Sequence, residues 1–173
     1  ILSKEDFPVS YGFLESMMND ILTSDDISYQ EEFDWEINII DDETRNAFAT
    51  PGGQIYVYTG LIFFLDNEDQ LAGVIGHEIA HADQRHGSKQ MQRSYTISAL
   101  LNIVSGGETT QLKEIVKELA GTGALLKFSR DAEAEADDFS VKYLEETDYA
   151  CNGAAAFFQK ILNVQPEQQP EFL

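Results

Sequence analysis

A histidine pair with an adjacent glutamate is the strongest chemical signal in this sequence, which reads His77-Glu78-Ile79-Ala80-His81. Positions four apart lie one turn above each other on one face of an α-helix, so the two imidazoles could bind one Zn²⁺ ion. Glu78 would then stand within reach of a water molecule at the metal, as a general base. With three histidines in the chain, chance would produce this pattern in roughly a few of a thousand such sequences. We therefore favour a zinc site over coincidence.

The motif needs a helix around it, and residues 67–86 have the features of one. Asn67 and Gln70 resemble a capping box, and the two residues between them are acidic, as suits a helix N-terminus. One side of the helix is apolar and carries Leu71, Val74, Ile75, Ile79 and Ala82. A second side carries only small residues, namely Gly73, Gly76 and Ala80. Glu78 falls on the apolar side, where an ionised carboxylate is costly unless it is compensated. We predict a central, buried helix whose glutamate is used chemically.

A catalytic zinc ion takes three protein ligands and leaves one position for water. No third histidine is suitably placed, and the acidic stretch from Ser129 to Asp138 offers carboxylates instead. If residues 130–146 are helical, Glu133 and Asp137 point inward beside an apolar stripe, whereas Asp131, Glu135 and Asp138 form a polar face. We assign Glu133 as the third ligand and Asp137 as the acceptor for the outer N–H of a ligand imidazole.

Two other residues with metal-binding side chains fit this site less well. His86 follows His81 by five positions, which on a continuous helix rotates it well away from the ligand residues. We interpret it as a surface or structural residue. Cys151 is the single cysteine, which excludes an intramolecular disulfide. It could bind metal but stands alone, and we interpret it as a packing residue.

Composition narrows the class of protein. The chain of 173 residues is 43% hydrophobic, which is enough for one globular domain with a sizeable core. Its formal net charge of −20 repels nucleic acid and anionic membrane surfaces, so we exclude a direct role at either. The apolar runs fall well short of the roughly 20 residues that a membrane-spanning helix needs.

The coarse reading is an α+β fold, mostly helical, with a small and largely antiparallel three-stranded sheet. Strands are predicted over 33–40, 46–50 and 54–59, and helices over 7–22, 67–86, 89–104, 108–120, 130–146 and 152–164. We see no internal repeat or linker. Residues 1–173 are therefore expected to form a single metallopeptidase domain, which we read as excised from a longer protein.

Three segments together resemble a known family: the gluzincin metallopeptidases of the HtpX-like, CAAX-prenyl-endopeptidase type, and most closely their soluble BepA-like periplasmic branch. Residues 46–61 look like the edge strand and hairpin of that family. His77–His81, continuing through Arg85-His86, looks like its active-site helix. Ser129-Arg130-x-x-Glu133-x-x-Ala136-Asp137 looks like its glutamate-ligand helix.

The resemblance implies a zinc endopeptidase with one Zn²⁺ per chain, Glu78 as general base and Glu133 as third ligand. It implies that Asn46 and Ala47 bind the backbone of a polypeptide substrate, which adds to the sheet edge as an extended strand. It also implies an extracytoplasmic location, periplasmic or envelope-associated, and a role in quality control of unfolded or misassembled proteins. The alternative is a zinc-stabilised binding or chaperone-like module with latent or absent peptidase activity.

Overall fold

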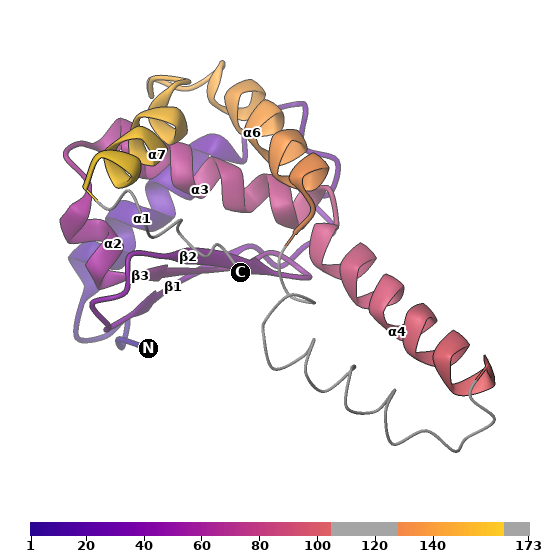
Figure 1. Cartoon of the computed structure of the whole chain (residues 1–173). Helices are drawn as coiled ribbons and strands as arrows, with labels where there is room; N and C mark the ends of the chain where they lie inside the picture. The colour runs from indigo at the N-terminus through magenta and orange to yellow at the C-terminus, as the bar shows by residue number, and fades with distance from the viewer. Residues whose placement is uncertain (105–127, 165–173) are drawn as a thin grey trace.

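The computed structural model describes residues 1–104 and 128–164, and within them it has the predicted α+β architecture (Figure 1). The helices are α1 (Pro8–Ile21), α2 (Thr59–Phe64), α3 (Glu68–Asp83), α4 (His86–Val104), α6 (Arg130–Leu144) and α7 (Gly153–Val164). The strands are β1 (Glu36–Ile40), β2 (Ala47–Thr50) and β3 (Gln54–Tyr58). The helix predicted over 108–120 lies outside the described residues.

The sheet is mixed, which corrects the prediction of a largely antiparallel one. Its strand order is β1-β3-β2. The β2–β3 hairpin is antiparallel and turns through Gly52 and Gly53, whose φ angles are 99° and 94°. The central strand β3 runs parallel to β1, with Ile37 opposite Ile55. The apolar alternation of β1 marks its buried face but carries no information on direction, because a strand presents the same face whichever way it runs.

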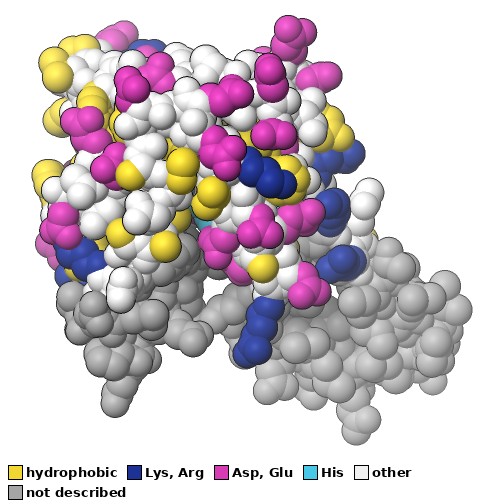
Figure 2. All heavy atoms as spheres, turned by 90° about the horizontal axis from the view of Figure 1, so that it is seen from above, with side chains coloured by type: hydrophobic (Ala, Val, Ile, Leu, Met, Phe, Trp, Pro, Cys, Tyr) yellow, Lys and Arg dark blue, Asp and Glu magenta, His cyan; other side chains and the backbone are white. Residues whose placement is uncertain are grey.

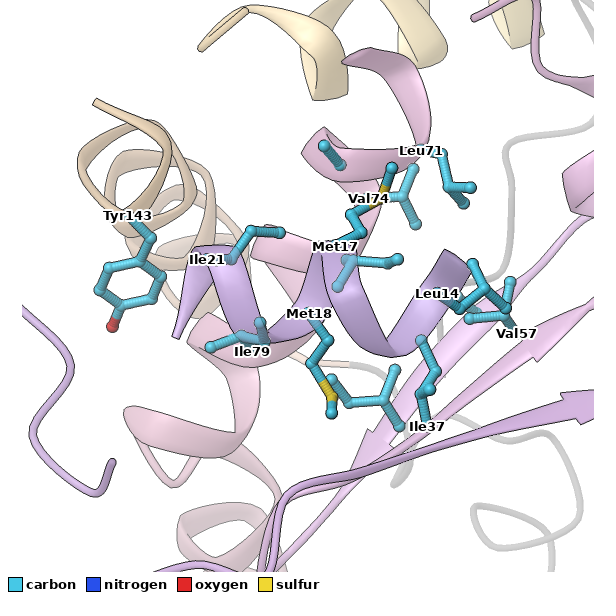
Figure 3. Packing of buried hydrophobic residues seen from close by; sticks show 14 of the residues in the cluster. Leu14, Met17, Met18, Ile21, Ile37, Val57, Leu71, Val74, Ile79 and Tyr143 are labelled. Atoms are coloured by element: carbon cyan, nitrogen blue, oxygen red, sulfur yellow. The ribbon is translucent and has the colours of Figure 1, made fainter. Parts of the chain in front are cut away.

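Helix α3 is the centre of the fold, as predicted. One side of α3 faces the sheet and α1, and the other side faces α6 and α7 (Figure 1). Every residue of α3 from Gln70 to Asp83 is buried. Leu14, Met17, Met18 and Ile21 of α1 pack between α3 and the sheet, against Leu71, Val74, Ile79, Ile37 and Val57 (Figure 3).

The small residues of α3 are where the outer helices come closest. A Cβ added to Gly73 would overlap the backbone nitrogen of Ala154, at the start of α7. A Cβ added to Gly76 would lie 3.6 Å from the Cβ of Ser140 on α6, an ordinary packing distance. The prediction that this side of the helix admits a close neighbour is therefore confirmed, most strictly at Gly73.

The surface reflects the acidic composition. Seen from above, the face over α6 and α7 carries many Asp and Glu side chains and few Lys or Arg (Figure 2). In the part of the chain that the structure describes, none of the helices is both long enough and apolar enough to cross a membrane.

Candidate active site

The second half of α3 carries His77, Glu78 and His81, and the start of the helix is fixed by its cap. The Oδ1 atom of Asn67 accepts a hydrogen bond from the N–H of Gln70 at 3.0 Å, as the sequence predicted. The Gln70 side chain reaches back to the N–H of Asp66 at 3.0 Å, one residue beyond its place in a standard capping box. The cap therefore fixes where the helix begins and hence which residues face α6.

Three side chains converge into a group that could hold a metal ion. The Nε2 atoms of His77 and His81 are 2.9 Å apart. Oε2 of Glu133 lies 3.4 Å from Nε2 of His77 and 3.7 Å from Nε2 of His81. Ligands that bind one metal ion at about 2.05 Å in tetrahedral geometry are about 3.3 Å from each other. The observed separations bracket that value, so two imidazoles and one carboxylate fit a metal ion here.

Helix α6 brings Glu133 to the histidines. The helix starts at a cap in which Oγ of Ser129 accepts a hydrogen bond from the N–H of Ala132 at 3.2 Å. Its buried residues Ser140 and Leu144 pack on α3 near Gly76. Glu133 is half-buried on this side, and Asp131, Glu135 and Asp138 are exposed as the helical rotation predicted. Burial acts to raise the pKa of Glu133, but hydrogen bonds with His77 and His81 outweigh it and lower the pKa to about 2.

Asp137 reaches the outer face of His77, one turn along α6 from Glu133. Its Oδ1 lies 2.9 Å from Nδ1 of His77, although the Asp137 side chain is 55% exposed and so is less inward than predicted. Burial acts to lower the pKa of His77, and the hydrogen bonds to Asp137 and Glu133 override it and raise the pKa to about 9. The structure thus brings Asp137 to the nitrogen that faces away from Glu133.

Glu78 is buried, with 1% of its surface exposed. Burial raises the pKa of its carboxyl to about 8, and the charge of His77 and a backbone hydrogen bond from Ala49 only partly offset this effect. The apolar surroundings predicted from the helical rotation are therefore present. A carboxyl with this pKa can take up and release a proton near neutral pH.

Asn46 and Ala47 lie where β2 begins, at the edge of the sheet next to α3. Both are buried, and Oδ1 of Asn46 has no hydrogen-bond partner among the described residues. The carbonyl of Asn46 accepts a hydrogen bond from the N–H of Tyr58 at 3.1 Å. Because antiparallel pairing alternates along a strand, the backbone groups of Ala47 and Ala49 point away from β3. The sheet edge therefore presents backbone groups beside Glu78.

The interpretation of His86 as turned away from the ligand residues is wrong. Its side chain is buried, and its Nδ1 lies 2.9 Å from Nδ1 of His81. Its Nε2 lies 3.0 Å from Oε2 of Glu135. The cause is a break in the helix: Arg85 has a φ of 57°, and α4 starts afresh at His86. A rotation counted along one continuous helix could not foresee this return.

A second feature that the sequence analysis missed joins α3 to α6 beyond the histidines. The hydroxyl of Tyr143 donates a 2.7 Å hydrogen bond to Oδ2 of Asp83, and the backbone N–H of Tyr29 donates one of 2.9 Å to Oδ1. Asp83 is buried, with 1% of its surface exposed. Burial and the neighbouring Asp83 raise the pKa of the Tyr143 hydroxyl, so it stays a donor. No local pattern could link residues 60 positions apart.

Comparison with known proteins finds metalloproteases among the relatives of this chain. The metalloprotease YcaL of Escherichia coli is 34% identical over 122 residues, which cover 69% of this chain and 48% of that protein. The β-barrel assembly-enhancing protease of Escherichia coli is 32% identical over 134 residues, or 72% of this chain and 28% of the relative. The mitochondrial metalloendopeptidase OMA1 of Schizosaccharomyces pombe is 29% identical over 135 residues, which cover 78% of this chain and 40% of that protein.

The chain spans less than half of the length of each of these relatives. The family match is more extensive, because the profile of "Peptidase family M48" covers residues 10–172. That range includes both helices that carry the histidine–glutamate group and the strand beside Glu78. This chain belongs to peptidase family M48.

Proposed function

We propose that this chain hydrolyses peptide bonds as a zinc-dependent endopeptidase. The observation that carries the proposal is the meeting of His77, His81 and Glu133 from two helices, with the buried carboxyl of Glu78 on the same turn of α3. A structural role for these residues would not need a glutamate in an apolar environment. Membership of a peptidase family points the same way.

Zinc is the metal we propose, with one ion per chain. Two imidazole nitrogens and one carboxylate oxygen are the ligand set of many catalytic zinc sites, in which a fourth position stays open for water or substrate. His77 and His81 would bind through Nε2, because these atoms face each other and Glu133. Asp137 would hold the ring of His77 through Nδ1, which leaves Nε2 as the donor to the metal.

When bound, zinc would supply a Lewis acid for the scissile carbonyl and lower the pKa of a water molecule. The chain's own contribution is made by Glu78. We propose that this carboxylate takes the proton of the attacking water and passes it to the nitrogen of the leaving amine. In the metal-free chain, burial raises the pKa of Glu78 to about 8, toward the working pH at which proton transfer to and from a carboxyl is most efficient.

The substrate we propose is an unfolded or misassembled polypeptide, bound as an extended strand along the outer edge of β2. The outward backbone groups of Ala47 and the carbonyl of Ala49 would pair with it, while the N–H of Ala49 donates a hydrogen bond to Glu78. Asn46 would add its side chain, whose buried Oδ1 lacks a partner among the described residues. The name of one relative, β-barrel assembly-enhancing protease, fits such a role. An extracytoplasmic location, periplasmic or envelope-associated, goes with this proposal.

Cleavage of casein, an unfolded protein, tests the proposal. We expect the zinc-loaded chain to cut it, a chelator to abolish cleavage, and added zinc to restore it. Glu78→Gln should keep its zinc and lose about 10²–10⁴-fold in rate, as expected when a general base is removed. Undiminished cleavage by Glu78→Gln would contradict the role of Glu78. Zinc-dependent binding of casein without cleavage by the unaltered chain would favour the chaperone-like alternative.

A further inference from the structure

His86, which is buried, and Glu135, which is exposed, extend the proposed metal site outward. Arg85 lies in the left-handed region, at a φ of 57°, and the turn there brings the side chain of His86 back to the ring of His81. His86 is 4% exposed, a degree of burial that polar rings reach when they are hydrogen-bonded. Glu135 comes from α6, two residues after Glu133. The second layer therefore comes from the start of α4, through His86, and from α6, through Glu135.

The contacts run in one line from His81 to Glu135. Nε2 of His81 faces His77 and Glu133, and the opposite nitrogen, Nδ1, lies 2.9 Å from Nδ1 of His86. Nε2 of His86 then lies 3.0 Å from Oε2 of Glu135. Each ring thus uses both of its nitrogens, and the line ends on a carboxylate at the protein surface.

The proton positions along this line follow from the chemistry of imidazole. If Nε2 of His81 gives its lone pair to a metal ion, Nδ1 of the same ring must carry the hydrogen. That hydrogen needs an acceptor, so Nδ1 of His86 has to be unprotonated, and Nε2 of His86 carries the hydrogen instead. Glu135 accepts it as a carboxylate. One arrangement of hydrogens therefore satisfies every nitrogen and is the arrangement that a metal ligand requires.

The surroundings shield the line of contacts. The ring of Phe128 stacks on His81, with centroids 4.2 Å apart and an angle of 17° between the planes, and it lies 5.9 Å from His86. His77 has a simpler arrangement, because its outer nitrogen meets Asp137 directly. Both proposed histidine ligands thus end on a carboxylate of α6, and only His81 uses an intermediate ring.

We propose that His86 and Glu135 are positioning residues, which fix the tautomer and ring orientation of His81 and so raise the affinity of the site for zinc. This inference rests on the proposed function, because it assumes that His81 binds the metal. Outer partners of this kind typically change metal affinity by about 10–100-fold. The inference goes beyond the three ligands by giving the remaining histidine a role.

The test is the zinc dissociation constant, measured by competition with a chromophoric chelator. We expect His86→Phe, which removes the acceptor for His81, to weaken binding by about 10–100-fold. His86→Asn should retain most of the affinity, because its Oδ1 can take the place of Nδ1. Glu135→Ala should weaken binding by less, since the His86 ring remains. Asp138→Ala, an exposed residue of the same helix, is the matched control and should bind as the unaltered chain does.

Two outcomes separate this inference from the proposed function. Wild-type affinity in Glu135→Ala, and in His86→Phe where that variant folds, would overturn the inference while leaving the zinc site intact. Failure of the unaltered chain to bind zinc would overturn the proposed function itself. Glu135→Ala changes an exposed residue, so it keeps the test decisive even where His86→Phe does not fold. Absorption spectra of the cobalt-loaded proteins provide a second readout, because His86→Phe should alter the bands and Asp138→Ala should not.

Discussion

The two helices that build the site differ in their exposure. Helix α3 is buried from Gln70 to Asp83, whereas α6 buries only Ala136, Ser140, Tyr143 and Leu144. Glu78, the proposed general base, lies on the buried helix, where burial raises the pKa of its carboxyl. The carboxylates that contact the histidine ring of His77, Glu133 and Asp137, lie on the helix that solvent reaches. The buried helix α3 therefore raises a carboxyl pKa, and the exposed helix α6 supplies the carboxylates that contact the histidines.

This division implies different tolerances to substitution. A change on α3 alters a tightly packed interior, while most positions of α6 face water and should accept replacement with little effect. The few α6 residues that touch α3 are the exceptions.

The largest effect is expected from Gly73→Ala, compared with Gly76→Ala on the same helix. An added methyl group at Gly73 overlaps the backbone of Ala154, which has no flexible end to move aside. At Gly76 it meets Ser140 at an ordinary distance of 3.6 Å. We expect Gly73→Ala to lower the free energy of unfolding by about 3 kcal/mol. Gly76→Ala should be neutral or stabilising by up to about 1 kcal/mol, from helix propensity. Denaturant titration measures both, and equal effects would contradict the close approach at Gly73.

The hydrogen bond between Tyr143 and Asp83 should come next. Tyr143→Phe removes the hydroxyl and leaves a buried carboxylate oxygen with one donor fewer. We expect the free energy of unfolding to fall by about 1–3 kcal/mol. Tyr95→Phe is the control, because Tyr95 is 72% exposed on α4 and should change stability by less than about 0.5 kcal/mol. Similar values for both variants in chemical denaturation would show that this contact does not fasten α6 to α3.

A smaller effect is expected in the pH dependence of the metal-free protein. The carboxyl of Glu78 has a pKa of about 8 when folded, against an ordinary value of 4.5, and His77 has one of about 9 against 6.5. Between pH 6.5 and 8 the folded state therefore binds more protons than the unfolded state, so stability falls as pH rises. His81, with a folded pKa of about 4, has the opposite slope, but only below about pH 6.5.

We expect the free energy of unfolding to decrease by on the order of 1 kcal/mol per pH unit in that window. Glu78→Gln removes one of the two contributions and should flatten the slope. Denaturant unfolding of chelator-treated protein at pH 6.5, 7.2 and 8 provides the measurement. A stability that rises with pH in the unaltered chain, or an unchanged slope in Glu78→Gln, would be inconsistent with the burial of this carboxyl.

Sequence reasoning predicted the placement of the candidate side chains where the backbone is regular. The rotation of an uninterrupted helix from Ser129 onward separated Glu133 from Glu135, and the same counting put Glu78 among apolar residues. It failed at His86, because the left-handed turn at Arg85 restarts the helical phase. It also overstated the burial of Asp137, which lies at the edge of its face with 55% of the side chain exposed.

What the sequence could not reveal depends on contacts between distant segments. The direction of β1 relative to β3 is invisible in a pattern of alternating burial. The hydrogen bond between Tyr143 and Asp83 joins two helices, and the periodicity of neither helix predicts it. Both features follow from how the elements pack, and periodicity within one element carries no record of its partner.

The most direct test of a site shared between the buried and the exposed helix is zinc content. Glu133→Ala should lose most of its bound zinc after dialysis, because α3 alone supplies only two ligands. Asp138→Ala, on the solvent face of the same helix, should keep one zinc per chain, the content that we expect of the unaltered protein. Elemental analysis for zinc, together with the protein concentration, gives the number of zinc ions per chain. Full zinc content in Glu133→Ala would contradict the assignment of the third ligand to α6.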